Sequence, residues 1–281
     1  MSGALVGLKE KSLKKSEWIV EPVNGLLLVK SPLLSAHSGE LTHAFTTRHG
    51  GNSSEHLSSF NLGRHIDDED ARHDAMQNRE QLCRSLGVNH AKLTVPGQVH
   101  SATVHVVRAH NATANLKEVD AVTTNLKNCP LLLHFADCVP IILFDPVSQS
   151  IAVVHAGWRG TAACIVKNAV NEMTRNFGAK PRDILGAVGP AIGSCCYPTG
   201  DDAAEKLSKT VRCAVGLVER PADGDQMRAD LKALNAMQLY EAGVESVDVT
   251  DLCTACRPDI FYSHRQSGGK TGRQGALAQL L

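Results

Sequence analysis

The sequence predicts one domain of α/β or α+β class, with a largely antiparallel or mixed sheet in its core. Strand-like and helix-like segments follow one another along the 281 residues without a regular βαβ rhythm. No internal repeat and no low-complexity linker divides the chain. The segment 131–144, LLLHFADCVPIILF, is too apolar for a surface strand and is typical of a buried one.

The N-terminal part separates into an arm and the start of the domain. Residues 1–16 are rich in lysine, and we expect a solvated, flexible arm there, followed by a single domain over 17–281. Residues 17–47 alternate short apolar runs with Pro, Gly and Ser, which indicates strands and turns. Residues 48–64 have the Gly, Ser and His content of a loop.

Further elements follow from helix-ending glycines and from strand composition. Residues 69–86 are expected to form a helix that ends at Gly87, and 92–110 return to strand character. The apolar run 131–144 then leads through Asp145-Pro146 into a second strand, IAVVHAGW.

Two more helices complete the prediction. The first runs from a capping Thr161 to Phe177 and ends at Gly178. The second covers 226–242 and ends at Gly243.

Composition excludes several classes of protein. Lys+Arg and Asp+Glu are both 29, and a nucleic-acid-coating or polybasic membrane protein would show a basic excess. Aromatic residues are only 4%, which argues against stacking platforms for single-stranded nucleic acid. The nine cysteines form no regular framework, and no apolar stretch has the length of a membrane helix or leads to a cleavage site. We therefore expect a cytoplasmic protein.

The best local signal for chemistry is the pair of segments ADCVPIILFD and IAVVHAGWRGT. If they form a hairpin, Cys138 and His155 lie directly opposite each other, with Cβ atoms about 5 Å apart. A shift of the turn by about one residue would make them diagonal neighbours instead. Such a pair suits two ligands of one metal ion. The alternative is a buried thiol beside a hydrogen-bonded core histidine.

A catalytic zinc site has three protein ligands and one open position. His100, in GQVHSATVHVV, is the leading third candidate because it follows a short strand and a Pro-Gly break. His105 and His134 compete with it, although each lies inside an apolar run that favours core packing.

Two glycine-containing segments could bind an anion. In TTRHGGNSS, Arg48 and Gly50-Gly51 offer a guanidinium and backbone amides, although a flexible loop with a surface arginine is the simpler interpretation. SHRQSGGKTGRQG combines Arg265, Lys270 and Arg273, which could hold phosphate or could form a solvated loop.

Four cysteines outside this triad occur in two short motifs. Cys195 and Cys196 are adjacent in a Gly/Pro turn, where packing is more common than reactivity. Cys253 and Cys256 form a CxxC, which is half of a structural zinc site. Because there is no second CxxC, a separate zinc here is the less favoured interpretation.

Together these segments resemble the YfiH-type family, known as laccase-domain or polyphenol oxidase proteins and also as purine nucleoside phosphorylases. The resemblance runs from about Thr42 to Arg273. Its motifs, in order, are THAFTTRHGG, FNLGRHIDDE, Asn78-Arg79, QVHS, DAVTT, ADCVPI, HAGWRGT, GPAIGSCCY and DLCTAC…FYSHR…TGR. The loop NSSEHLSS departs from the commoner form of the family, which contains Pro and Tyr.

The resemblance implies a layered α/β/β/α sandwich and a His-Cys-His metal site at His100, Cys138 and His155. It associates Arg48 with phosphate and substrate binding. The implied activity is zinc-dependent phosphorolysis of adenosine, inosine, guanosine and methylthioadenosine, together with deamination of adenosine. The partners are then purine nucleosides and phosphate, with no nucleic acid and no membrane. The oligomeric state is left open.

Physical reasoning adds two residues to this expectation. Arg159 is a weaker supporter of phosphate binding. Asp137, beside the cysteine ligand, could orient a ligand or handle a proton, or it could be a structurally bonded carboxylate.

Two other functions compete. Copper-dependent phenol oxidation is compatible with the ligand types, but a multicopper oxidase needs many histidines, typically in H-x-H pairs, and this sequence has none. A non-enzymatic binding module would use the metal for structure only, and a fourth tight protein ligand would favour it.

Overall fold

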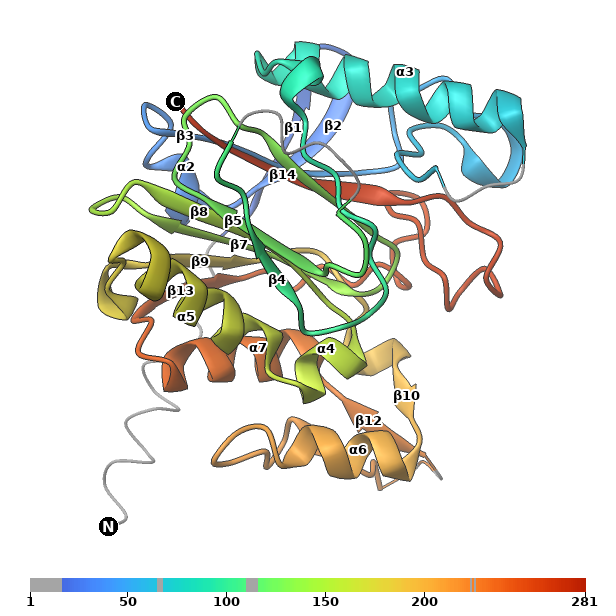
Figure 1. Ribbon diagram of the computed structural model, residues 1–281. Helices are drawn as coiled ribbons and strands as arrows, with labels where there is room; N and C mark the ends of the chain where they lie inside the picture. Colours follow the sequence, from blue (N-terminus) through green and yellow to red (C-terminus); the bar gives the residue numbers. More distant parts are fainter. Residues whose placement is uncertain (1–16, 65–67, 110–115, 223, 225) are drawn as a thin grey trace.

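The computed structural model describes residues 17–64, 68–109, 116–222, 224 and 226–281. The arm predicted for residues 1–16 lies outside the described residues. Helix α3 (Glu69–Leu86), a five-stranded sheet, a six-stranded sheet and a layer of helices are stacked in that order (Figure 1). This is the layered α/β/β/α arrangement that the family resemblance implies.

The five-stranded sheet is antiparallel throughout. Its order is β1 (Ile19–Val23), β2 (Leu26–Lys30), β3 (Leu41–Thr46), β14 (Gln274–Leu280) and β6 (Leu131–Phe135), with the short helix α2 (Pro32–Ser35) between β2 and β3. Helix α3 packs Leu82 and Cys83 onto its outer face. As predicted, α3 ends at Gly87, whose φ of 69° is the left-handed conformation of a helix C-cap.

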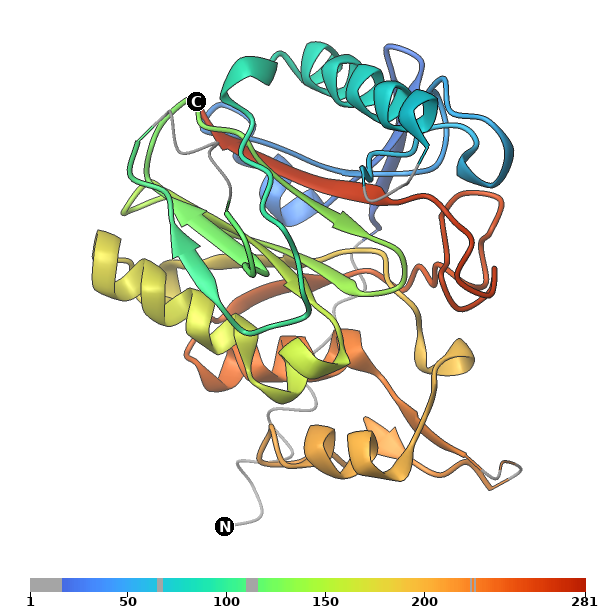
Figure 2. The same cartoon turned by 45° about the vertical axis from the view of Figure 1, so that its right-hand side comes forward.

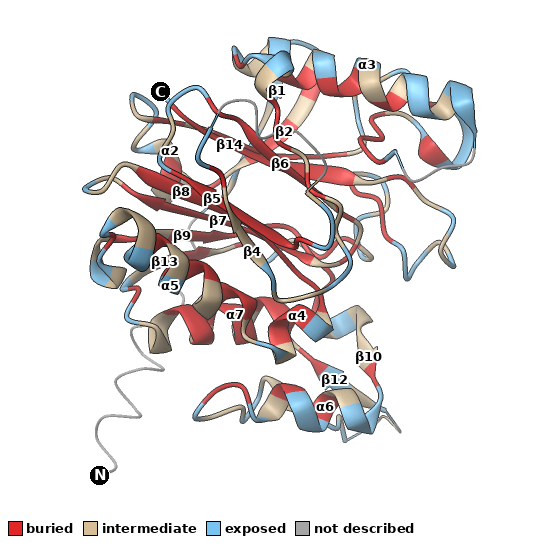
Figure 3. Ribbon diagram, in the orientation of Figure 1, coloured by how far each residue is buried: buried red, intermediate tan, exposed pale blue. Residues whose placement is uncertain are grey.

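The six-stranded sheet is antiparallel at its centre and parallel at both edges. Its order is β13 (Ser246–Val249), β9 (Leu185–Val188), β7 (Val139–Asp145), β8 (Ser150–Ala156), β5 (Ala121–Thr124) and β4 (Val104–Val106). Strands β7 and β8 are buried along their whole length (Figure 3). Ile142 and Phe144 face the other sheet, whereas Ile141 and Leu143 face the helices. This explains the continuous apolar run, since both faces of the strand are covered.

Helices α4 (Trp158–Ala162), α5 (Ile165–Phe177) and α7 (Leu231–Glu241) cover the outer face of this sheet. Beyond them lies α6 (Asp201–Ser208), with a small sheet of β10 (Pro198–Thr199), β12 (Met227–Ala229) and β11 (Val218–Glu219) (Figure 2). Single 3₁₀ turns occupy Glu55–Leu57, His90–Lys92, Pro181–Asp183 and Ser194–Cys196. Among the described residues, no helix has the length and apolar character needed to cross a membrane.

Two strand predictions were wrong in extent. The run 131–144 is two strands in different sheets, because the chain crosses between the layers at residues 136–138, where Asp137 has a φ of 82°. Strand character was expected over 92–110; among the described residues 92–109, only Val104–Val106 form a strand, while Thr94 and Gly97 make isolated bridges.

Two helix predictions were also wrong at their starts. The helix expected from Thr161 begins at Trp158 and is broken at Cys164, whose φ of 56° starts the second helix. The helix expected over 226–242 is preceded by strand β12, and α7 starts only after Asp230, whose carboxylate accepts a hydrogen bond from the Ala233 amide.

Candidate active site and metal centre

The β7–β8 hairpin sets the relation between the first two predicted metal ligands. Its register pairs Asp145 with Ser150 and Pro140 with His155. Cys138 therefore precedes β7 and is diagonal to His155, so direct opposition was wrong and the alternative with a shifted turn is the observed one.

His100 completes the cluster from the loop before β4. The ligand atoms of His100, Cys138 and His155 all lie within 4.8 Å of one another. Ligands at 2.0–2.3 Å from one tetrahedral zinc are about 3.3–3.8 Å apart, so small side-chain movements would close the cluster around an ion. Within the described ranges, no fourth His, Cys, Asp or Glu joins this group. The donor set therefore fits a metal with an open coordination position.

Asp120 organises two of the three ligands. It lies opposite His155 where β5 meets β8, and its side chain is fully buried. Its Oδ1 accepts hydrogen bonds from His155 Nδ1 at 2.9 Å and from the His100 amide at 2.9 Å. Its Oδ2 accepts from the amides of Val99 and Ser101 and from the Ser101 hydroxyl. A carboxylate on Nδ1 turns Nε2 of the histidine toward the metal position.

Gly157 permits the close approach of the ligands. A Cβ at this position would lie 2.9 Å from His100 Cδ2 and 3.1 Å from Cys138 Sγ. The glycine of HAGW is thus required sterically, because any side chain here would push the ligands apart.

Opposite charges within the cluster shift one another's pKa values. Burial alone would raise the pKa of Cys138, but the adjacent His155 and His100 lower it. Burial alone would lower the pKa of His155, but the Cys138 thiolate and the Asp120 carboxylate raise it. Against its own burial, Asp120 has a lowered pKa because of hydrogen bonds from His155 and Ser101. The thiolate, which is the form that binds metals, is therefore favoured.

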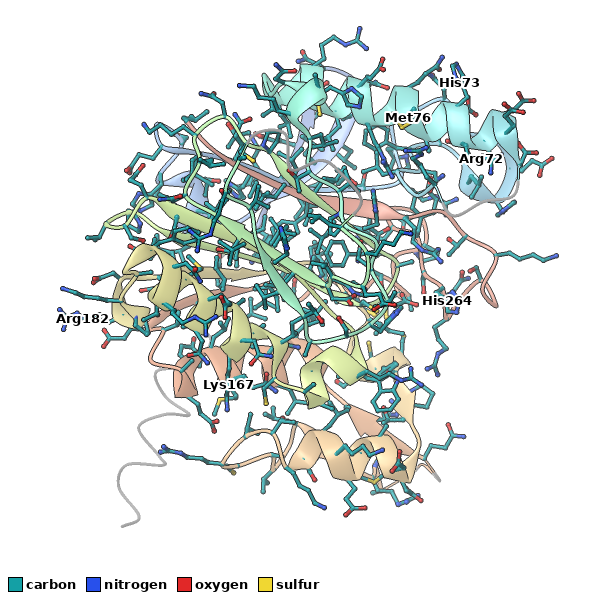
Figure 4. All side chains as sticks on the ribbon, viewed as in Figure 1. Arg72, His73, Met76, Lys167, Arg182 and His264 are labelled. Carbon is teal, nitrogen blue, oxygen red and sulfur yellow. The ribbon has the colours of Figure 1, made fainter. Side chains whose placement is uncertain are left out.

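A pocket of about 400 Å³ opens over the three ligands. Loops from both sheets contribute its walls, including the loop between β13 and β14, where Figure 4 labels His264. Besides the ligands, the lining residues are Asn61, Gly63, Gln98, His134, Ala136, Asp137, Ile192, Tyr197, His264, Arg265, Thr271 and Arg273. The pocket combines a metal-binding wall with two arginines, which suits a small polar substrate and an anion.

The structure does not bring Arg48 into this lining. Its guanidinium donates to the carbonyls of Ser58 and Pro258 and lies over the Tyr262 ring, with Cζ 4.9 Å from the centroid. The phosphate-binding role expected for Arg48 stays a prediction.

Arg159 also lies outside the lining, over the Trp158 ring. It is close enough to act on the pocket electrostatically. Burial and the Cys138 thiolate raise the pKa of Tyr197 to about 12, while Arg265 and Arg159 oppose that rise.

Asp137 lies in the pocket wall and ties two loops together. Its Oδ1 accepts from the Thr254 hydroxyl at 2.6 Å, and its Oδ2 accepts from the Arg265 amide at 2.7 Å. These bonds make Asp137 a structurally bonded carboxylate, and it keeps further lone pairs in the pocket wall. Its role in orienting a ligand or handling a proton stays a prediction.

Some site residues carry no local signal in the sequence. Asp120 and His155 are 35 residues apart and meet only through the β5–β8 pairing. The signal that could have found Asp120 is chemical, because a metal-binding histidine needs a hydrogen-bond partner for its second ring nitrogen. Arg265 and Arg273 do line the pocket, as the phosphate interpretation of their segment requires, whereas Lys270 does not. His134 lines the pocket outside the metal cluster, near Arg79, and His105 lies on β4.

Comparisons with known proteins identify the family of the chain. The family described as multi-copper polyphenol oxidoreductase laccase matches residues 42–281. Purine nucleoside phosphorylase YlmD of Bacillus subtilis is 36% identical over 243 residues, covering 83% of this chain and 86% of the relative. Adenosine deaminase RL5, from an unknown prokaryotic organism, is 35% identical over 249 residues, covering 85% and 94%. The crystal structure of YlmD from Geobacillus stearothermophilus superimposes with a TM-score of 0.84 at 33% identity, covering 94% and 99%.

Proposed function

This chain belongs to the multi-copper polyphenol oxidoreductase laccase family, and from that premise we propose that it is a zinc-dependent purine nucleoside phosphorylase that also deaminates adenosine. The observation that carries the proposal is the three-ligand cluster on the wall of a pocket that also contains two arginines. The names of the relatives supply the substrate class, with one named for phosphorolysis and one for deamination.

The ligand set suits a catalytic ion. A zinc ion bound there would lower the pKa of a coordinated water to about 7, which is the activation that deamination requires. Asp120 holds His155 and the His100 loop in place for the ion. Gly157 lets the side chains of His100 and Cys138 approach each other closely.

Phosphorolysis needs an anion held beside the ribose. Phosphate attacks the anomeric carbon, the bond to the purine nitrogen breaks, and the departing base takes up a proton. We assign the phosphate to Arg265 and Arg273 because both line the pocket. Arg265 Cζ lies 5.1 Å from the Tyr197 ring centroid, and its backbone is held by Asp137. In this proposal Asp137 positions Arg265 through its backbone amide. Arg48 binds the carbonyls of Ser58 and Pro258, and Arg159 acts on the pocket through its positive charge.

The copper alternative has less support in the donor set. Within the described residues, the two candidate metal groups are this triad and a group of four cysteines. Neither has the several histidines that a trinuclear copper cluster requires.

The test is to incubate the zinc-loaded protein with inosine or adenosine, with and without phosphate, and to identify the products. We expect free base and ribose 1-phosphate only when phosphate is present, and inosine from adenosine in either case. Oxidation of a phenol by the copper-loaded protein, without nucleoside cleavage by the zinc-loaded protein, would contradict the proposal.

A further inference from the structure

Four cysteines gather at a second place, outside the catalytic pocket. Cys195 and Cys196 lie in the 3₁₀ turn Ser194–Cys196, and Cys253 and Cys256 lie in the turn after β13. All four Sγ atoms are within 4.8 Å of one another. Cys256 Sγ lies 3.5 Å from Cys195 Sγ and 3.4 Å from Cys196 Sγ. The structure thus supplies the second pair of cysteines that the CxxC lacks in the sequence.

Parallel strand pairing brings these two segments together. Strands β9 and β13 are parallel neighbours, so the chain leaves both at the same edge of the sheet (Figure 1). The pairing continues beyond the strands as a bridge between Ala191 and Cys253, and the Thr254 amide donates to the Ala191 carbonyl at 3.1 Å. Backbone hydrogen bonds between the two segments therefore fix the relative positions of the four cysteines.

The sulfur positions suit one tetrahedral metal ion. Four thiolates bound to zinc at 2.3 Å lie about 3.8 Å from one another. The observed separations of 3.4 Å and 3.5 Å, and the common limit of 4.8 Å, span that value. A disulfide needs a sulfur–sulfur distance of about 2.05 Å and would pair the cysteines two by two, whereas here one sulfur approaches two others equally.

The surroundings suit a negatively charged centre. Zinc with four thiolates carries a net charge of −2. The Gly193 amide donates to Cys253 Sγ at 3.2 Å, and a Cβ on Gly193 would lie 3.1 Å from Cys195 Sγ. The buried Lys232 ammonium donates to the carbonyls of Thr250 and Leu252, immediately before the CxxC.

An access route is also present. A cavity of about 400 Å³ is lined by Cys195, Cys196 and Arg228, among others, so a metal ion can reach the sulfurs from solvent. Arg228 adds a second cation, and its guanidinium donates to the Cys195 carbonyl at 3.3 Å.

We propose that Cys195, Cys196, Cys253 and Cys256 bind a second, structural zinc ion that is independent of the catalytic centre. Each thiol releases its proton to solvent as it binds, and all four coordination positions are then filled by protein. The ion ties together the two loops that supply Tyr197 and Arg265 to the pocket. Its role is to hold that wall, and no step of the nucleoside chemistry passes through it.

The test uses the Cys138→Ala variant, in which the catalytic centre is broken, so that the remaining zinc reports the second site. After purification under reducing conditions, we expect about one zinc per chain. X-ray absorption should show a shell of sulfur only at about 2.3 Å. Cobalt substitution should give intense thiolate-to-metal absorption.

Two further variants in the same background separate ligands from bystanders. Adding Cys253→Ser and Cys256→Ser should reduce the zinc to near zero. Adding Cys213→Ser, which removes a thiol outside both clusters, should leave one zinc per chain. A Cys138→Ala protein without zinc, a shell containing nitrogen or oxygen, or disulfides among the four cysteines would each overturn the proposal. The zinc content and absorption of Cys138→Ala alone decide the matter even if the triple variant does not fold. None of these readouts depends on nucleoside cleavage.

Discussion

Replacing Asp120 with Asn tests how the metal centre is held together. The substitution keeps the shape of the side chain but removes its charge. It also places an amide group among five donors: His155 Nδ1, the Ser101 hydroxyl and the amides of Val99, His100 and Ser101. At least one of these buried donors then loses its acceptor, and His155 loses the partner that orients its ring.

The expected size of the effect follows from this geometry. Loss of an outer partner of a metal-binding histidine costs about ten- to a hundredfold in metal affinity. That range corresponds to about 1.4–2.7 kcal/mol. Because Asp120 also fixes the His100 loop, we expect the upper half of the range.

The assay is a calorimetric titration of metal-free protein with chelator-buffered zinc. The binding step that belongs to the site of His100, Cys138 and His155 is identified as the one that Cys138→Ala abolishes. Asp145→Asn is the matched control, because Asp145 is equally buried and accepts from the Val147 amide and the Ser148 hydroxyl, at the far end of the hairpin. Asp145→Asn should leave that step unchanged. A folded Asp120→Asn protein with wild-type affinity at that step would refute the reasoning.

Three further predictions test the pocket and the core. Gly157→Ala should lower zinc affinity at the three-ligand site by about ten- to a hundredfold while circular dichroism stays unchanged, because relieving about 1–3 kcal/mol of overpacking moves the ligands; an unchanged affinity at that site in the zinc titration would contradict this. Arg265→Ala should slow phosphorolysis about ten- to a hundredfold without loss of zinc, since a charge-assisted contact contributes about 1.5–3 kcal/mol. A larger loss of phosphorolysis in Arg48→Ala would show that Arg48 binds the phosphate instead. Burial, with Lys30 nearby, lowers the pKa of His43 to about 4. Below about pH 6.5 the unfolded chain therefore binds a proton at His43, whereas the folded chain binds it only near pH 4. Unfolding free energy should therefore fall by up to about 3 kcal/mol between about pH 6.5 and pH 4; urea titrations in which His43→Gln shows the same decline would exclude this cause.

The local elements of the fold could be predicted from the sequence. Helix α3 was predictable over its full length because an acidic first turn and Gly87 mark its ends. The apolar run 131–144 was recognisable as buried but not as two strands, because both faces of β7 are covered and no polar alternation marks the crossing at Asp137. The break at Cys164 was also hidden, since no glycine or proline marks it.

The metal ligands of the site could be predicted from the sequence, whereas the long-range contacts around them could not. The three metal ligands could be named from hairpin spacing and from the resemblance, and the structure brings them together. Asp120 and the pairing of Cys195 with Cys256 depend on contacts between segments 35 and 61 residues apart. Spacing along the chain cannot reveal such contacts. The division into an arm and a single domain stays a prediction.

The most direct test of the central claim is zinc-dependent cleavage of inosine by phosphate, measured as ribose 1-phosphate released by metal-free protein while zinc is added back. The account predicts almost no product without metal, full activity once the site of His100, Cys138 and His155 is filled, and no recovery in the Cys138→Ala variant. Equal rates for metal-free and zinc-loaded protein, or full recovery in Cys138→Ala, would contradict it.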